Sequence, residues 1–223
     1  LGHCAACHTP RDSRGGPITG SRYMGGEIAG LGWDALPLAG LGDDSHDPEG
    51  MELAVLLKTG IHSRGAVSGP MAEVVFNSLQ YLKDDDIAAI VSYLRRLPKA
   101  ETPVAPRVPK VSADERAALR KRGAQVYGEH CADCHGDDGE GQSRKHPALA
   151  GSRLVNAVSA TNALRLTLDG GFPPSTEGNP YPYGMPPFSH SLSRADIAAV
   201  LTYIRSEWGN DAPAVAVVEV ERR

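Results

Sequence analysis

The stretches Cys4-Ala5-Ala6-Cys7-His8 and Cys131-Ala132-Asp133-Cys134-His135 share the pattern C-x-x-C-H. This spacing is the attachment signature of a c-type haem. Two thiols separated by two residues can add to the two vinyl groups of one porphyrin. The histidine that follows then lies under the iron and ligates it. The sequence therefore predicts two covalently bound haem c groups, with Cys4, Cys7, Cys131 and Cys134 as attachment points and His8 and His135 as iron ligands.

The number of cysteines supports this interpretation. The chain has 4 cysteines, and the two motifs use all of them. Structural zinc is the alternative, because C-x-x-C pairs are common zinc ligands. The pairs of a four-cysteine zinc site usually lie about 15–20 residues apart. Here the motifs are offset by 127 residues and each is followed by histidine, so the pattern favours haem over zinc or redox thiols.

Length, charge and hydropathy limit the class of protein. A chain of 223 residues favours one or two domains. Its net charge of −4 gives no support to nucleic-acid binding. No apolar run approaches the roughly 18 residues that span a bilayer, and no signal peptide is present. Since haem is attached covalently outside the cytoplasm, we expect a location in the periplasm or at the periplasmic face of the inner membrane, in a chain that has lost its export signal.

An internal repeat extends beyond the two motifs. The segment 86–95 matches 196–205 with an offset of 110 residues, and the same offset aligns 56–60 with 166–170. Two copies of one domain explain this pattern better than a solenoid, which needs three or more short repeats.

The repeated segments have helical patterns, so the sequence predicts an all-α fold. Acidic or hydroxyl residues precede both copies of the late helix, and apolar residues follow at helical spacing: Ile87, Ile90, Val91 and Leu94, then Ile197, Val200, Leu201 and Ile204. Helices are also predicted over 51–59 and 162–169, each ended by glycine, and over 112–130, which leads into the second motif.

A proline-rich segment divides the chain. Four prolines between Pro98 and Pro109 exclude a helix and favour an extended, semi-rigid connection. We therefore predict domain 1 over residues 1–97, a Pro-rich linker over 98–111, domain 2 over 112–210 and a C-terminal tail over 211–223. Domain 1 lacks the helix that leads into the second motif. Either something else fills that space or the chain continues upstream.

Methionine is the usual second axial ligand beside histidine in electron-transfer cytochromes c. In domain 2 only Met185 is available, in a proline-containing loop before the last helix. In domain 1, Met71 occupies the matching place between the middle and last helices. The alternatives are Met24 in a glycine-rich loop, then His46 and His62, whereas Met51 is expected to lie in the core of the middle helix.

A ligating histidine usually donates its second ring N–H to a carbonyl or carboxylate. Pro147 is the candidate partner of His135, and Pro10 or Pro17 that of His8, although these prolines can equally serve only to shape loops. Candidate hydrogen-bond donors to the haem propionates are Arg11, Tyr23, Trp33 and Arg144.

Several stretches resemble a known group, the multihaem cytochrome c subunits of membrane-associated dehydrogenases. This group serves alcohol and gluconate dehydrogenases and molybdenum-dependent aldehyde or nicotinate dehydrogenases. The resemblance covers nearly the whole chain and is carried by residues 2–11, 57–60, 69–75, 170–174, 183–188 and 203–210. It implies two tandem class I cytochrome c domains, with Met71 and Met185 at the axial methionine positions.

The number of haem motifs departs from this group. Such subunits usually carry three haem domains, and this chain has two motifs. The difference suggests the carboxy-terminal part of a longer protein, or a natural two-haem version. Members of the group often attach to the membrane through a terminal segment, and none is evident in this sequence.

The expected function is electron transfer rather than catalysis. We predict a dihaem c-type cytochrome that relays single electrons from a dehydrogenase catalytic subunit, of the flavin, quinoprotein or molybdenum type, to a quinone, an oxidase or a soluble acceptor. One alternative is a dihaem enzyme of the peroxidase or thiosulfate-oxidising type. Such an enzyme needs an open iron or a cysteine ligand, and no cysteine is spare. The other alternative is a free soluble electron shuttle.

Overall fold

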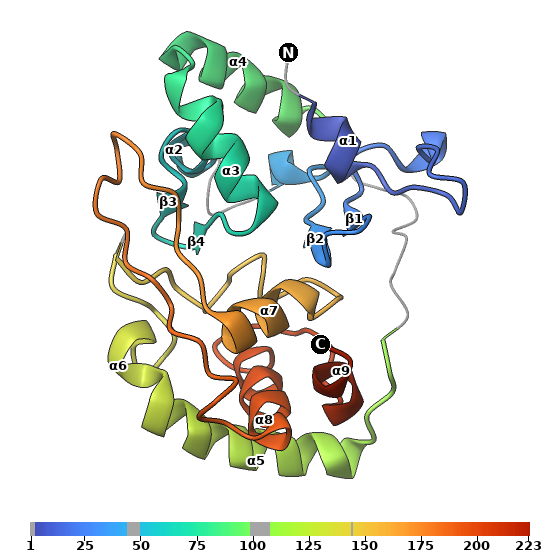
Figure 1. Cartoon of the computed structure of the whole chain (residues 1–223), viewed down its shortest axis with the longest axis vertical. Helices are drawn as coiled ribbons and strands as arrows, with labels where there is room; N and C mark the ends of the chain where they lie inside the picture. The colour runs from blue at the N-terminus through green and yellow to red at the C-terminus, as the bar shows by residue number, and fades with distance from the viewer. Residues whose placement is uncertain (1–2, 44–49, 99–107, 144) are drawn as a thin grey trace.

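The computed structural model describes residues 3–43, 50–98, 108–143 and 145–223 (Figure 1). Domain 1 lies at the top of the view and domain 2 below it. Domain 1 contains α1 (Cys4–His8), β1 (Gly26–Ile28), β2 (Trp33–Ala35), α2 (Met51–Thr59), β3 (Ile61–His62), β4 (Gly65–Ala66), α3 (Pro70–Asn77) and α4 (Asp84–Arg95), with 3₁₀ helices η1 (Thr19–Ser21), η2 (Leu41–Asp43) and η3 (Leu79–Tyr81). Domain 2 contains α5 (Ala113–His130), α6 (Ala132–His135), α7 (Thr161–Asp169) and α8 (Arg194–Ile204), and α9 (Val217–Glu221) follows.

The predicted helices form where capping residues begin and end them. Ser112 caps α5, since its side chain accepts a hydrogen bond from the amide of Glu115. Ser193 caps α8 in the same way, with the amide of Asp196 as donor. Helix α2 ends at Gly60, whose φ of 82° lies in the left-handed region that glycine adopts without steric cost. The helices predicted over 51–59 and 112–130 are therefore confirmed almost to the residue.

Short antiparallel hairpins interrupt the helical pattern of domain 1. Strand β1 pairs with β2, so that Gly26 lies opposite Ala35, and β3 pairs with β4. No sequence pattern predicts these hairpins, because strands of two or three residues are too short for an alternating apolar pattern. The described part of the chain is otherwise mainly helical.

Domain 2 is built on the crossing of α5 and α8. A side chain at Gly123 of α5 would place its Cβ 2.1 Å from the carbonyl oxygen of Ala199, so only glycine allows the two helix backbones to approach this closely. Ala198 and Ala199 are 0% and 1% exposed beneath α5. Tyr127 extends the contact toward the C-terminal end of α8, where its ring lies 4.9 Å from that of Trp208.

The C-terminal segment 211–223 folds onto domain 2. Arg205, at the end of α8, is 1% exposed and donates hydrogen bonds to the carbonyl oxygens of Pro213 (2.9 Å), Val155 (2.8 Å) and Ala157 (2.8 Å). Burial lowers the pKa of this guanidinium to about 10, so it remains charged at neutral pH. Val220 of α9 is fully buried against the same core.

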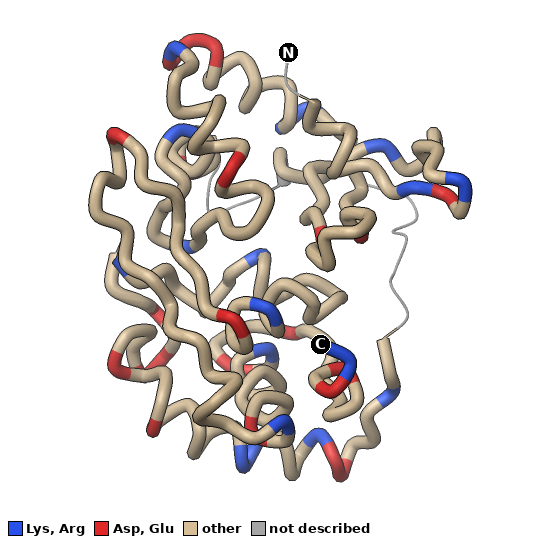
Figure 2. The backbone as a smooth tube through the Cα atoms, viewed as in Figure 1, with Lys and Arg blue, Asp and Glu red and all other residues tan. Residues whose placement is uncertain are grey.

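Domain 1 has a smaller core centred on α2, α3 and α4. Val75 is fully buried, and Ile87, Val91 and Leu94 of α4 pack against it as predicted. The outer face of α4 stays exposed, and Tyr93 there is 50% exposed. Figure 2 shows charges of both signs spread over the two domains, including the acidic residues at the start of α4.

The predicted Pro-rich linker lies largely outside the described residues. Pro98 and Pro109 stand at its two ends, whereas Pro103 and Pro106 fall within 99–107. Among the helices that the structure describes, none is long and apolar enough to cross a membrane.

The two domains contact one another through polar groups. The side-chain amide of Asn162 on α7 makes two hydrogen bonds with the backbone of Asp34 on β2. Its Nδ2 donates to the Asp34 carbonyl (2.7 Å), and its Oδ1 accepts from the Asp34 amide (2.9 Å). The Thr176 hydroxyl donates to the carbonyl of Thr59 at 2.9 Å. These bonds fix the orientation of domain 2 relative to domain 1.

Candidate haem sites

The first motif forms the short helix α1, and its histidine has a carbonyl partner. The Nδ1 of His8 lies 2.7 Å from the carbonyl oxygen of Leu36. The predicted partners, Pro10 and Pro17, are wrong. The carbonyl of Pro10 accepts from the amide of Ile18 instead, and Pro17 pairs with Arg11, because this loop folds back on itself.

The second motif follows α5 directly, and its cysteines and histidine lie on or beside α6. The amide of Cys131 donates to the carbonyl of Tyr127, which closes the last turn of α5. The Nδ1 of His135 lies 3.2 Å from the carbonyl oxygen of Pro147, so the predicted partner is confirmed. Burial raises the pKa of the Cys131 thiol to about 11.

The two motif histidines have the same hydrogen-bonding arrangement, which leaves one ring nitrogen available to bind a metal. A carbonyl oxygen can only accept a hydrogen bond, so Nδ1 carries the proton in both rings and Nε2 keeps its lone pair. Burial lowers the pKa of His8 and of His135, which favours the neutral form that binds metal. This arrangement fits His8 and His135 as iron ligands.

Met185 lies in a loop that backbone hydrogen bonds hold in place. Its amide donates to the carbonyl of Gly171 (2.8 Å), and its own carbonyl accepts from the amide of Gly171 (3.0 Å). A Cβ at Gly170 would lie 2.5 Å from the carbonyl oxygen of Met185, so the two loop segments meet at van der Waals distance. The thioether of Met185 is thereby presented from a fixed backbone.

Met71 lies instead in the first turn of α3. The preceding Gly69 has a φ of 53°, and a Cβ on this residue would lie 2.5 Å from the ring of Trp33. Met71 is half-buried and packs against the core of domain 1.

The alternative ligands of domain 1 have different environments. Met24 is half-buried in its loop, and His62 lies on β3 in a polar network. Met51 lies on α2, as predicted, but the expected core position is wrong, because the side chain points outward and is 66% exposed. His46 falls outside the described residues.

A cavity of about 330 Å³ lies between the two domains. The four groups predicted to hold the second haem, Cys131, Cys134, His135 and Met185, all line it. Domain 1 also lines it, with the apolar Leu36, Leu41, Leu53, Leu56 and Val67 and with polar residues that include Glu52, His62, Arg64 and Arg95. Cys4, Cys7, His8 and Met71 do not line this cavity, although Leu36, which accepts the hydrogen bond from His8, does.

The cavity fits a haem better than it fits a bare ion. Two thiols, an imidazole with a free Nε2 and a thioether face an apolar space, which suits a large, flat, apolar cofactor. The described cations that line it are Arg64, Arg95, Lys145 and Arg153, and these are suited to the carboxylates of propionates.

Of the propionate donors proposed from the sequence, Arg11 and Trp33 have other contacts in the structure. Arg11 donates to the carbonyls of Ala6 (3.0 Å) and Gly15 (2.7 Å). Trp33 packs on Gly69, and the guanidinium of Arg165 lies 5.0 Å from its ring. Arg144 lies outside the described residues. Sequence reasoning missed the four cations of the cavity, because no local pattern distinguishes a cavity-lining arginine from an exposed one.

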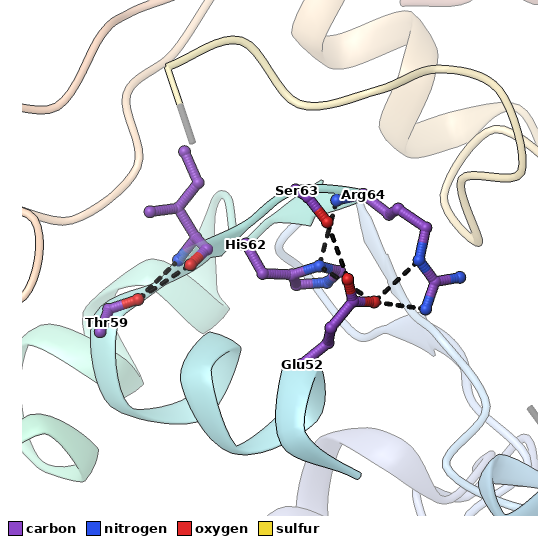
Figure 3. A network of polar contacts seen from close by, with 6 residues as sticks. Glu52, Thr59, His62, Ser63 and Arg64 are labelled. Atoms are coloured by element: carbon purple, nitrogen blue, oxygen red, sulfur yellow. Dashed lines mark hydrogen bonds and ion pairs between the residues drawn. The ribbon is translucent and has the colours of Figure 1, made fainter. Parts of the chain in front are cut away.

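A polar network fixes the β3–β4 hairpin, which borders this cavity (Figure 3). Glu52 of α2 accepts from the Ser63 hydroxyl (2.7 Å) and from Nε and Nη2 of Arg64 (2.8 Å for Nε). The Nδ1 of His62 accepts from the amide of Arg64 (3.1 Å). Burial opposes ionisation of Glu52, but the hydrogen bonds from Ser63 and Arg64 lower its pKa.

The two motifs do not form a shared zinc site. They lie on α1 and α6, which are far apart in the molecule (Figure 1). Within the described ranges, no group of three or more His, Cys, Asp and Glu residues is placed to hold a metal ion. All four cysteines are free thiols in this structure.

Comparison with known families agrees with these sites. The model of the cytochrome c family matches residues 2–98 and 120–208, and each of these spans contains one C-x-x-C-H motif. The chain belongs to the cytochrome c family. It therefore carries covalently bound haem c, and the two tandem family matches agree with the internal repeat.

Individual relatives are components of dehydrogenases. The cytochrome c subunit of a quinone alcohol dehydrogenase from Gluconacetobacter polyoxogenes is 37% identical over 95% of this chain and 47% of its own length. The cytochrome c subunit of gluconate 2-dehydrogenase from Pantoea cypripedii is 35% identical, over 98% of this chain and 52% of its own length. A nicotinate dehydrogenase component from Pseudomonas putida is 35% identical, over 96% of this chain and 18% of its own length.

The resemblance inferred from the sequence is thus confirmed. The chain spans about half the length of the alcohol and gluconate dehydrogenase subunits that it matches.

Proposed function

We propose that this chain is the dihaem electron-transfer part of a dehydrogenase complex. The observation that carries the proposal is the cavity between the domains. It is lined by the attachment and axial residues of the second site, and it reaches Leu36, the hydrogen-bond partner of His8. Two redox sites in adjoining domains form a relay for single electrons. Haem supplies the one-electron chemistry between ferrous and ferric iron.

We propose His8 with Met71, and His135 with Met185, as the axial ligand pairs. The paired carbonyls fix the two imidazoles, while the Gly171–Met185 bridge and the first turn of α3 fix the two methionine backbones. With both axial positions occupied by the protein, neither site leaves room for a substrate. Methionine ligation also raises the reduction potential relative to histidine ligation.

We propose a dehydrogenase catalytic subunit as the electron donor, because the relatives named above belong to alcohol, gluconate and nicotinate dehydrogenases. That subunit is of the flavin, quinoprotein or molybdenum type. The acceptor is a quinone, an oxidase or a soluble electron carrier. The Pro-rich segment 98–111 joins the two domains in this scheme.

We place the protein in the periplasm or at the periplasmic face of the inner membrane. Covalent attachment of haem to C-x-x-C-H takes place outside the cytoplasm, and the two motifs contain all four cysteines of the chain. In this scheme, a dehydrogenase partner brings the chain to the membrane.

Haem content and ligand spectra test the proposal. A pyridine haemochrome assay of the chain produced with haem maturation should give two haems per chain. The sulfur-to-iron charge-transfer band of the oxidised protein should weaken in Met71→Ala and in Met185→Ala, and it should vanish in the double variant. A band that persists in the double variant would refute the ligand assignment.

Two further measurements separate this function from other functions. A reduced protein that readily binds carbon monoxide at one haem would indicate an open iron and hence a dihaem enzyme. Purification from native membranes should recover a dehydrogenase subunit together with this chain. Recovery of the chain alone, without any catalytic subunit, would indicate a free electron shuttle.

A further inference from the structure

Each loop that holds a proximal histidine is contacted by the other domain. In domain 2, the amide of Ala148, next to Pro147, donates to the carbonyl of Ser63 in domain 1 at 3.0 Å. In domain 1, the carbonyl of Pro37, next to Leu36, accepts from Nη2 of Arg153 in domain 2 at 2.7 Å. Both contacts are therefore one residue away from the carbonyl that binds a histidine ring.

The two contacts differ in charge. The Ser63–Ala148 contact joins two backbone groups and carries no net charge. The Arg153 contact brings a guanidinium, which remains protonated in proteins, to the loop that binds His8. Arg153 and Leu36 also line the cavity of the second site, so this charge lies where the two domains meet.

The charge of Arg153 acts on the first site across the domain boundary. The Nη2 of Arg153 lies 2.7 Å from the carbonyl oxygen of Pro37, and the carbonyl of the neighbouring Leu36 binds the His8 ring, so the guanidinium stands close to the first site. A nearby cation disfavours any added positive charge at this site. Ferric iron carries one more positive charge than ferrous iron, so the same cation disfavours oxidation of an iron bound to His8.

We propose that Arg153 of domain 2 is a positioning residue for the haem of domain 1. It holds the Leu36–Pro37 loop against His8 and raises the reduction potential of that haem. This inference rests on the proposed function, because it requires two redox-active haems. It makes the domain interface part of the first redox site.

The test is a spectroelectrochemical titration of the holoprotein that carries Arg153→Gln. The Met71→Ala variant assigns the two potentials, because it perturbs the haem of domain 1 alone. In Arg153→Gln the potential of the domain 1 haem should fall, and it should fall further than in a variant that removes an equal charge away from the Leu36–Pro37 loop. Arg153→Lys keeps the charge and should restore most of the shift. Because Arg153 is exposed, the shift should also diminish as ionic strength increases.

Arg120→Gln is the matched control. It removes an equal charge from domain 2, but Arg120 pairs with Glu207 on an exposed surface and does not line the cavity. Two intact haems whose potentials respond equally to Arg153→Gln and Arg120→Gln would refute the inference and leave the proposed function standing. A wild-type chain with fewer than two haems would refute the proposed function itself, and this inference with it.

Discussion

Helices α4 and α8 have closely similar sequences, yet the structure buries them differently. Ala198 and Ala199 of α8 are fully buried, whereas the matching Ala88 and Ala89 of α4 are exposed. The reason is the neighbouring element: α5 crosses α8 at Gly123, while α2 and η2 pack on the opposite side of α4. A repeated sequence pattern therefore specifies a helix and the face that it turns to its own core. Whether the outer face of that helix is buried depends on which neighbouring element packs on it.

The largest expected effect tests the α5–α8 crossing. Gly123→Ala should destabilise domain 2 by about 3 kcal/mol, because its Cβ meets the backbone of Ala199 at 2.1 Å and neither helix can yield cheaply. Chemical denaturation followed by circular dichroism measures this change.

Gly128→Ala provides the control in the same helix. No atom lies within 4 Å of a Cβ at Gly128, so this substitution should stabilise α5 by up to about 1 kcal/mol through helix propensity. Equal effects of the two substitutions would show that the helix crossing does not depend on Gly123.

A smaller effect is expected from substitution of the matching tyrosines, Tyr93 on α4 and Tyr203 on α8. Tyr203 packs between Tyr127 and Trp208, with ring centroids 5.6 and 5.5 Å away. Tyr93 is 50% exposed and has an edge contact with Tyr23 at 6.2 Å. Tyr203→Ala should therefore cost about 2 kcal/mol and Tyr93→Ala about 1 kcal/mol in denaturant unfolding. Similar costs would mean that a partner covers α4 in solution as α5 covers α8.

The smallest expected effect concerns pH and domain 1. The folded state lowers the pKa of Glu52 below its ordinary 4.5, so the unfolded chain binds this proton more readily. The stabilisation that ionised Glu52 gives to domain 1 is therefore present above pH 4.5. It is lost as the pH falls through the lowered pKa of this carboxylate. In Glu52→Gln, the melting temperature of domain 1 should fall less between neutral pH and pH 3 than it does in the wild-type chain. Thermal melts over this pH range measure the difference.

Glu73→Gln is the control for general carboxylate effects, because Glu73 is exposed on α3. If both variants have the same acid profile, the network around Glu52 does not contribute to the pH dependence. Ser63 and Arg64, which donate to Glu52, lie in domain 1, so domain 2 should titrate as it does in the wild-type chain.

The methionine loops extend the comparison between the domains. Met185 is held by reciprocal backbone bonds to Gly171, whereas Met71 depends on the first turn of α3 and on the packing of Trp33 against Gly69. The sequence indicated both methionines by their matching places in the repeat. It did not indicate that two different backbone structures present them.

Some features of the sites could be predicted because they depend on neighbours in the chain. The C-x-x-C-H motifs, the capped helices and the Pro147 carbonyl, 12 residues from His135, belong to this group. The Leu36 carbonyl lies 28 residues from His8, beyond a loop of irregular structure, and the prolines nearer in sequence were chosen wrongly. The predicted core position of Met51 was wrong for a related reason, because a short helix can carry apolar residues on its outer face as well.

The sequence by itself determined the covalent chemistry, the repeat and the helices, because each depends on residue types at fixed local spacing. Only the tertiary structure decided which helix face is covered, which carbonyl fixes His8, and that Arg153 of one domain contacts the proximal loop of the other. The physical reason is that these contacts join segments separated by long stretches of chain. Their formation depends on the packing of both domains together, and no local pattern records it.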